Sequence, residues 1–132
     1  MILGIGIDLL KVSRIKKILD KYGYTFLSKV FTENEIKRNS KLISKVNKFA
    51  KCYASKEAFV KALGTGFKKG VTYKDISLNN LNTGQPFLSL SRSIKEELKK
   101  KTPTGYKPVV NVSITDEMEY VIANVIISLE KK

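Results

Sequence analysis

Residues 49–64, FAKCYASKEAFVKALG, predict a helix that has two surfaces to bury and yet carries charges on both. At about 100° per residue, small or apolar residues fall into two arcs around its axis. The first arc is bulky and consists of Phe49, Cys52, Tyr53, Phe59, Val60 and Leu63. The second consists of the alanines Ala50, Ala54, Ala58 and Ala62. Lys56 lies near the middle of the first arc, Glu57 borders the second, and Lys61 lies inside it, so these three charges are the first candidates for a functional site.

These charges also have ordinary structural explanations. Glu57 and Lys61 are one helical turn apart, and an exposed ion pair between them would be worth about 0.3–0.5 kcal/mol. Lys56 would lay its stem along apolar surface and extend its ammonium to solvent. Two features favour a function instead. An alanine stripe marks a surface that something approaches closely, and the helix runs directly into the glycine loop GTGFKKG (64–70) with its two lysines.

The N-terminal stretch ILGIGIDLL (2–10) alternates in a way that predicts a strand with two unequal faces. One face is bulky and holds Leu3, Ile5, Ile7 and Leu9. The other is nearly bare, because Gly4 and Gly6 precede Asp8 there, and glycine in a strand marks close approach by another backbone or a ligand. Two ionised carboxylates about 4 Å apart repel by roughly 4 kcal/mol at an effective dielectric of about 20, so a pair such as Asp8 and Glu57 needs a proton, a lysine or a metal between its members.

The donor types available point to a hard cation. The chain has no His and only Cys52, which makes the usual zinc sites and His-based catalysis implausible and excludes an intrachain disulfide. Oxygen ligands favour Mg²⁺ or Ca²⁺, and Mg²⁺ characteristically takes one or two carboxylates and completes its shell with waters and substrate phosphates. Neighbouring lysines would neutralise the remaining phosphate charge. The residues alone therefore predict magnesium–phosphate chemistry. The GTG segment follows a helix, so it is neither a Walker loop nor a dinucleotide fingerprint, and a helix C-cap is its ordinary explanation.

The length and the net charge of the chain limit the number of domains and the kinds of partner that it can have. A chain of 132 residues predicts one domain, 1–132, with no transmembrane helix and no signal peptide. The net charge of +13 attracts polyanions such as nucleic acid, an anionic membrane, a phosphate-rich small molecule or an acidic protein. Charge alone does not rank these partners, and a general enrichment in lysine explains part of the excess equally well. The absences favour a cytoplasmic location.

The order of the predicted elements favours an α+β fold, with an antiparallel sheet packed on helices, over a doubly wound sheet. The opening strand is followed by a helix that Ser13 can cap and Gly23 can end, and then by a capping box from Thr32 to Glu35. After the central helix, residues 75–91 predict a hairpin and residues 93–101 a short exposed helix. Two strong strands, at 109–115 and 120–129, flank the acidic turn 116–119.

Several stretches resemble, in order, the landmarks of the holo-[acyl-carrier-protein] synthase family. They are GIGIDLLKVSRI near the start, FTENE, YASKEAFVKALGTG, GQP in the hairpin, and VSITDE near the end. These proteins are the small, stand-alone 4′-phosphopantetheinyl transferases of bacteria, and the resemblance spans nearly the whole chain. Its most specific part is the central motif with Lys56, Glu57 and Lys61, paired with the N-terminal Gly-x-Asp that ends at Asp8.

The resemblance implies a role for each candidate residue. Asp8 and Glu57 would be the protein ligands of Mg²⁺, which also holds the pyrophosphate of coenzyme A. Lys61 would contact phosphate and stabilise charge on the reacting group. Lys56 would reach the same site with its head while its stem packs.

The resemblance also implies how the nucleotide and the subunits are arranged. Gly64 and Gly66 would let their loop approach the nucleotide. The family fold is α+β and usually a trimer with active sites between protomers, which would make the alanine stripe and the glycine-faced strand close-contact surfaces.

The implied reaction is attack by a serine hydroxyl of apo acyl carrier protein on the β-phosphate of coenzyme A, which releases 3′,5′-ADP. The nucleophile belongs to the partner, in keeping with a chain that offers no Ser-His or Cys-His dyad. A carboxylate and a metal-bound water both stay open as the base that takes the serine proton.

A basic helix face would dock the acidic carrier protein in this family. The residues in question, at spacings of three and four, are Lys11, Arg14, Lys17 and Lys21. A merely solvated basic face is the alternative. Arg14 is the preferred anchor, because a basic face would steer an acidic partner in a salt-dependent way.

Two departures from the family pattern concern the nucleotide. Many relatives have Arg where Cys52 stands and His where Asp116 stands, so the contacts to the 3′-phosphate stay open. The substitutes considered are Lys45, Lys48, Lys51, Lys68 and Lys69. The competing interpretations are a basic nucleic-acid-binding domain and a non-catalytic relative that binds carrier protein or coenzyme A. We expect neither nucleic acid nor a membrane as partner.

Overall fold

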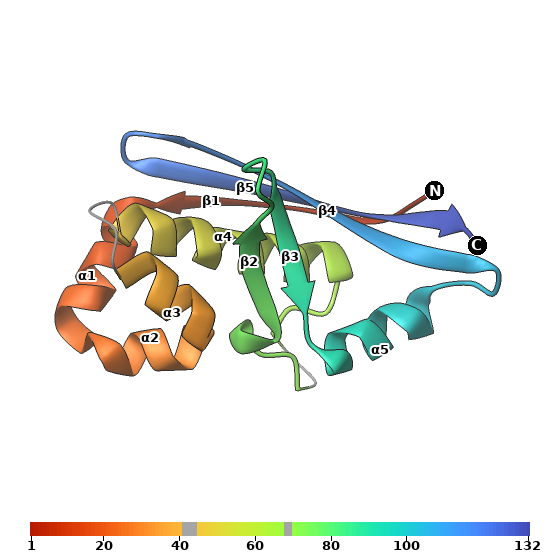
Figure 1. Cartoon of the computed structure of the whole chain (residues 1–132), viewed down its shortest axis with the longest axis horizontal. Coiled ribbons are helices and arrows are strands. Elements are labelled where there is room, and N and C mark those ends of the chain that lie inside the picture. Colours follow the sequence, from red (N-terminus) through yellow and green to blue (C-terminus); the bar gives the residue numbers. More distant parts are fainter. Residues whose placement is uncertain (41–44, 68–69) are drawn as a thin grey trace.

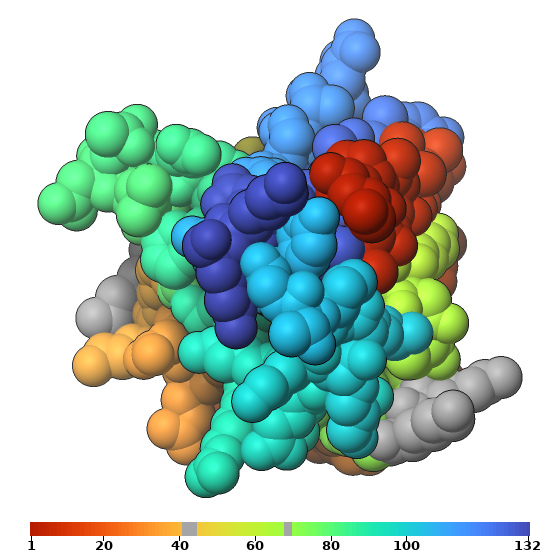
Figure 2. Space-filling view, turned by 90° about the vertical axis from the view of Figure 1, so that its right-hand side faces the viewer, coloured from red at the N-terminus to blue at the C-terminus, as the bar shows by residue number. Residues whose placement is uncertain are grey.

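The computed structural model describes residues 1–40, 45–67 and 70–132 (Figure 1). In chain order the elements are β1 (Ile2–Lys11), α1 (Val12–Tyr22), α2 (Tyr24–Val30), α3 (Glu33–Ser40), α4 (Lys45–Leu63), the 3₁₀ turn η1 (Tyr73–Asp75), β2 (Ile76–Asn80), β3 (Pro86–Leu90), α5 (Arg92–Lys101), β4 (Tyr106–Glu117) and β5 (Tyr120–Lys131). The N-terminus and the end of β5 lie at one end of the molecule, close to α5 (Figure 2).

Two antiparallel sheets are present. The larger has the strand order β1-β5-β4, and the smaller is the hairpin β2-β3. The long helix α4 runs beneath the larger sheet and packs on β1 and β5 (Figure 1). The predicted α+β fold with an antiparallel sheet on helices is therefore confirmed, as is the hairpin.

The glycine face of β1 lies directly on the backbone of α4. A Cβ atom added at Gly4 would be 1.9 Å from the carbonyl oxygen of Ala62, and one added at Gly6 would be 1.9 Å from that of Ala58. Only glycine permits this approach, and only a residue as small as alanine permits it from the helix side. The alanine stripe and the glycine face thus contact each other within one chain, and the expectation that they form contacts between protomers is wrong.

The core lies between the inner face of the sheet, α4 and the N-terminal helices. Every second residue of β5 is buried, namely Val121, Ala123, Val125, Ile127 and Leu129. From the helical side, Phe31, Phe49 and Phe59 are buried against one another or against this face, and Phe31 and Phe49 have ring centroids 4.8 Å apart. No helix among the described residues is both long and apolar enough to cross a bilayer.

The predicted signals at Thr32 and Gly23 are confirmed, but α4 begins at Lys45, four residues before the predicted stretch, and the helix α2 was not predicted. The capping box is present, because the Thr32 N–H donates to Glu35 Oε1 at 3.0 Å and the Glu35 N–H donates to Thr32 Oγ1 at 3.3 Å. Gly23 ends α1 with φ +52°. The predicted Ser13 cap is wrong, since α1 already begins at Val12, whose N–H donates to the carbonyl of Glu119 on the neighbouring hairpin.

Candidate functional site

Asp8 and Lys61 meet where β1 crosses α4. The Lys61 ammonium donates to the carbonyl oxygen of Ile7 at 2.9 Å and to Asp8 Oδ1 at 3.2 Å. The Asp8 side chain is only 15% exposed, whereas that of Lys61 is 53% exposed. Burial raises the pKa of Asp8, the hydrogen bond from Lys61 opposes this, and the nearby charge of Glu57 adds to the rise. The two carboxylates therefore lie close enough to repel each other, beside an ammonium that is open to solvent.

Glu57 is held by a tyrosine rather than by Lys61. The Tyr73 hydroxyl, from the turn η1, donates to Glu57 Oε1 at 2.8 Å, and the Tyr53 hydroxyl lies 3.4 Å from that of Tyr73. Burial raises the pKa of Tyr73, and its hydrogen bonds to Tyr53 and Glu57 raise it further. Among the described residues no salt bridge joins Glu57 to Lys61, so the exposed i,i+4 pair is not the explanation of these charges.

Lys56 is not brought to this site. Its side chain is fully buried, and its ammonium donates to Glu35 Oε1 at 2.6 Å, to the carbonyl of Tyr73 at 2.9 Å and to the carbonyl of Ile76. Burial lowers the pKa of Lys56, and the Glu35 carboxylate opposes this. Because all three donors of the ammonium are used, the expectation that its head contacts the nucleotide is not supported by the geometry, and neither is the solvent-exposed alternative. Lys56 instead ties α4 to α3 and to the start of β2.

The glycine loop after α4 has the backbone that only glycine adopts easily. Gly64 has φ +83° and Gly66 has φ +61°, and apart from the chain neighbours no atom of the described residues lies within 4 Å of where a Cβ would be at either position. The Gly64 N–H donates to the carbonyls of Val60 and Lys61, so Gly64 is the C-cap of α4. Gly64 and Gly66 thus give this part of the chain, next to Lys61, a backbone that a side chain would strain.

The four residues predicted to dock the carrier protein, Lys11 at the end of β1 and three residues of α1, are all exposed. They are Lys11, Arg14, Lys17 and Lys21. Burial raises the pKa of both Asp8 and Tyr53, and Arg14 lies close enough to each for its positive charge to oppose this rise. The basic face of α1 thus borders the carboxylate site.

A basic pocket of about 280 Å³ lies on a different side of α4 from Glu57 and Lys61. Its lining includes Arg38, Lys48, Lys51 and Cys52, whose thiol pKa burial raises to about 12. Lys51 also forms an ion pair with Asp116 at 3.2 Å, so the two positions that depart from the family pattern both lie at or beside this pocket. Lys45 is exposed, and Lys68 and Lys69 lie outside the described residues.

The outer face of the larger sheet is apolar and exposed. Ile5, Ile7 and Leu9 of β1 are 62%, 59% and 61% exposed, and Ile5 and Leu9 pair with Ile126 and Ile122 of β5. An open hollow of about 760 Å³ continues this face toward the β4–β5 turn. On the same face, Asn124 pairs with Ile7, and its buried Oδ1 has no hydrogen-bond partner among the described residues. Side chains from elsewhere in the described part of the chain leave this surface exposed.

The relatives of the chain identify its family. Residues 4–123 match the sequence model of the 4′-phosphopantetheinyl transferase superfamily. The holo-[acyl-carrier-protein] synthase of Caulobacter vibrioides is 44% identical over 127 residues, which cover 96% of each chain. The chain belongs to the 4′-phosphopantetheinyl transferase superfamily.

Solved phosphopantetheinyl transferases have the same fold. The holo-[acyl-carrier-protein] synthase of Neisseria meningitidis matches with a TM-score of 0.88 at 31% identity, covering 97% of this chain and 99% of that one. The Bacillus anthracis enzyme, solved in complex with CoA (3′,5′-ADP), matches with a TM-score of 0.77 at 35% identity over 96% of each chain. The resemblance drawn from the motifs is confirmed, and so is the prediction that the protein is an enzyme of this superfamily.

The motifs predicted Asp8, Glu57 and Lys61, but three further residues of this region were missed. The capping box was a sufficient explanation for the glutamate at position 35, so its second role as the counter-charge of Lys56 was not predicted. Tyr53 was counted as part of the apolar arc. Tyr73 had no signal, because its position beside Glu57 depends on how the chain returns after the glycine loop.

We predict that Lys56→Met destabilises the protein by about 3–5 kcal/mol, because it leaves the Glu35 carboxylate buried without its counter-charge. Urea unfolding measures the change. The double variant Lys56→Met/Glu35→Gln should recover part of the loss, since the neutral amide still accepts a hydrogen bond from Thr32. Unchanged stability together with weakened coenzyme A binding would instead return Lys56 to the nucleotide site.

Proposed function

We propose that the protein transfers the 4′-phosphopantetheine group of coenzyme A to a serine of apo acyl carrier protein, in a Mg²⁺-dependent reaction that releases 3′,5′-ADP. The observation that carries the proposal is the contact of Asp8 with Lys61 at the crossing of β1 and α4, with Glu57 near enough for its charge to act on Asp8, in a chain of this superfamily. All three relatives named above are holo-[acyl-carrier-protein] synthases, and one of them was solved with CoA (3′,5′-ADP).

The residues fit a magnesium ion. Asp8 and Glu57 offer carboxylate oxygens, and no cluster of three or more His, Cys, Asp or Glu side chains exists among the described residues that would favour an all-protein metal cage. Mg²⁺ suits such an incomplete set, because it takes its remaining ligands from water and substrate phosphate. When bound, Mg²⁺ would act as a Lewis acid and as a template for the pyrophosphate.

The chain's own contribution is to position the phosphate and neutralise its charge. Lys61 is anchored through Asp8 and the Ile7 carbonyl, yet half of its side chain is open, so its ammonium can accompany charge that develops on the phosphate. In the proposed step, the serine oxygen forms a bond to the β-phosphorus and the bond from that phosphorus to the 3′,5′-ADP oxygen breaks. Carboxylates embedded next to Arg14 and Lys61 favour this chemistry over nucleic-acid binding, since without a metal they would repel a phosphate backbone.

The basic pocket is the best candidate for the phosphates of the nucleotide. Arg38, Lys48 and Lys51 supply its positive charge, so Lys48 and Lys51 are the substitutes that we propose for the 3′-phosphate contacts. Lys48 and Glu57 are nine residues apart, about 180° around the α4 axis, so this pocket and the carboxylate site face different sides of one helix.

A homotrimer would bring these two half-sites together. One coenzyme A could reach the carboxylates of one chain and the basic pocket of the next. The exposed apolar face with Ile5, Ile7 and Leu9 supplies a surface for such an assembly, because contiguous apolar patches of this kind mark interaction sites. The proposed substrates place the reaction in the cytoplasm.

We predict that Glu57→Gln lowers the transfer rate about 100-fold or more, because a neutral amide is a poor magnesium ligand. Mass spectrometry of apo acyl carrier protein, incubated with coenzyme A and Mg²⁺, measures the gain of one phosphopantetheine. EDTA should abolish the gain, and Glu33→Gln, an exposed position on α3, should leave it unchanged. Transfer that persists in EDTA or in Glu57→Gln would refute the metal assignment.

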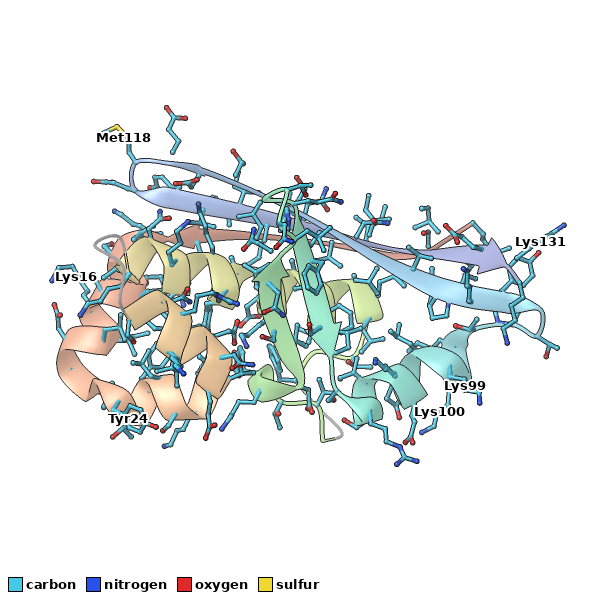
Figure 3. The ribbon with its side chains drawn as sticks, in the orientation of Figure 1. Lys16, Tyr24, Lys99, Lys100, Met118 and Lys131 are labelled. Carbon is cyan, nitrogen blue, oxygen red and sulfur yellow. The ribbon has the colours of Figure 1, made fainter. Side chains whose placement is uncertain are left out.

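Arg14→Ala should raise the KM for carrier protein about fivefold, the equivalent of about 1 kcal/mol for one surface charge pair, and leave the KM for coenzyme A unchanged. Steady-state kinetics at two salt concentrations measures both constants. Lys16→Ala is the matched control, since Lys16 projects from another side of α1, where it pairs with Asp20 (Figure 3). Equal effects on both substrates would exclude a docking role for Arg14.

Ile5→Glu should shift the protein from trimer to monomer, because it places a charge within the exposed apolar face. Light scattering coupled to size-exclusion chromatography measures the mass, and transfer activity should fall in parallel. Tyr24→Glu changes an equally exposed residue on α2 and should alter neither quantity. A parent protein that runs as a monomer with full activity would refute the assembly.

A further inference from the structure

Tyr73 links Glu57 to the structure around the glycine loop. Its hydroxyl donates to Glu57 Oε1 at 2.8 Å and lies 3.4 Å from the hydroxyl of Tyr53. Its ring stacks on Phe67, the residue that follows Gly66, with centroids 3.7 Å apart and planes inclined by 26°. The ring of Tyr53 also stacks on the ring of Tyr73, with a centroid distance of 5.5 Å and an angle of 21° between the planes.

The backbone of Tyr73 is as firmly held as its ring. The turn η1 has a complete capping box, in which the Thr72 N–H donates to Asp75 Oδ2 at 2.8 Å. The carbonyl oxygen of Tyr73 accepts a hydrogen bond from the buried Lys56 ammonium at 2.9 Å. Because both the ring and the main chain of Tyr73 are held in place, its hydroxyl has a fixed position next to Glu57.

Glu57 itself has few other restraints. It lies half-buried on α4, and no salt bridge to it is found among the described residues. A glutamate side chain that is free to rotate loses rotamer entropy when it becomes a metal ligand. A hydrogen bond to one carboxylate oxygen orients such a ligand in advance, and removing a partner of this kind typically costs about 10–100-fold in metal affinity or activity.

We propose that Tyr73 is a positioning residue for Glu57, whose hydroxyl holds Oε1 so that the other carboxylate oxygen is presented to the divalent cation. The inference rests on the proposed function, in which Glu57 and Asp8 share that cation. Tyr53 supports the arrangement by stacking on the ring of Tyr73 and by placing a second hydroxyl next to it. Lys56, whose side chain is fully buried, contributes to the arrangement by holding the backbone carbonyl of Tyr73.

Tyr73→Phe tests the proposal, because it keeps the stacked ring and removes one oxygen atom. The affinity for Mn²⁺, measured by calorimetry on the full-length protein in the presence of coenzyme A, should fall about tenfold. In the transfer assay the Mg²⁺ activation constant should rise by a similar factor, while kcat at saturating Mg²⁺ changes much less. The thermal unfolding midpoint should stay near that of the parent, which separates positioning from a loss of stability.

Two controls bracket the expected result. Tyr53→Phe removes the neighbouring hydroxyl but leaves the bond from Tyr73 to Glu57, so it should weaken Mn²⁺ binding less than Tyr73→Phe does. Tyr24→Phe changes a hydroxyl on the exposed surface of α2 and should leave Mn²⁺ binding unchanged (Figure 3).

Two outcomes would overturn the inference, and they are distinguishable. If Glu57→Gln abolishes Mn²⁺ binding but Tyr73→Phe binds Mn²⁺ as the parent does, the positioning role is wrong and the proposed function stands. If the parent with coenzyme A binds no Mn²⁺ and transfers nothing to carrier protein, the proposed function falls and this inference falls with it.

Discussion

The site depends on the direct contact between the backbones of β1 and α4. The carbonyl groups of Ala62 and Ala58 occupy the space that a Cβ atom at Gly4 or Gly6 would need. The strand and the helix therefore approach each other more closely than they could with any residue other than glycine at these positions. This approach brings Asp8, at the end of the glycine face, within hydrogen-bond distance of Lys61, which is 53 positions further along the chain. A bulky residue at Gly6 would separate the two elements and the two charges with them.

The charged groups of α4 divide into two kinds, which differ in burial rather than in residue type. Lys56 of α4 and Glu35 of α3 are completely buried and satisfy each other and four backbone groups, so they fix how α3, α4 and β2 meet. Glu57 and Lys61, one and five positions beyond Lys56, stay partly open to solvent and can respond to a ligand. The buried pair is nevertheless connected to Glu57 through Tyr73. The Lys56 ammonium donates to the carbonyl of Tyr73, and the Tyr73 hydroxyl donates to Glu57.

The sequence predicted what local periodicity and short motifs determine. The strand alternation placed Asp8 at the end of a glycine face, helical spacing placed Glu57 and Lys61 together, and the capping box set the start of α3. It failed where a long-range partner decides the outcome. The side of α4 on which Lys56 lies is apolar. Only the fold shows that the carboxylate of Glu35, 21 residues earlier in the chain, forms an ion pair with Lys56 there. The start of α1 was likewise set by a hydrogen bond to Glu119, which no local signal at Ser13 reveals.

Helix α4 also explains why one chain of this kind is an incomplete enzyme in the function that we propose. A helix buried along most of its length can present functional groups only where it emerges, and α4 emerges on one side with Glu57 and Lys61 and on another with Lys48 and Lys51. A single nucleotide cannot pass through the helix to touch both sides. Two copies related by rotation can turn unlike sides of this helix toward each other, and the apolar outer face of the sheet is the surface that such an assembly would bury. In the proposed assembly, the separation of charges around one helix and the exposed isoleucines of β1 would have a common cause, namely a substrate site built between chains.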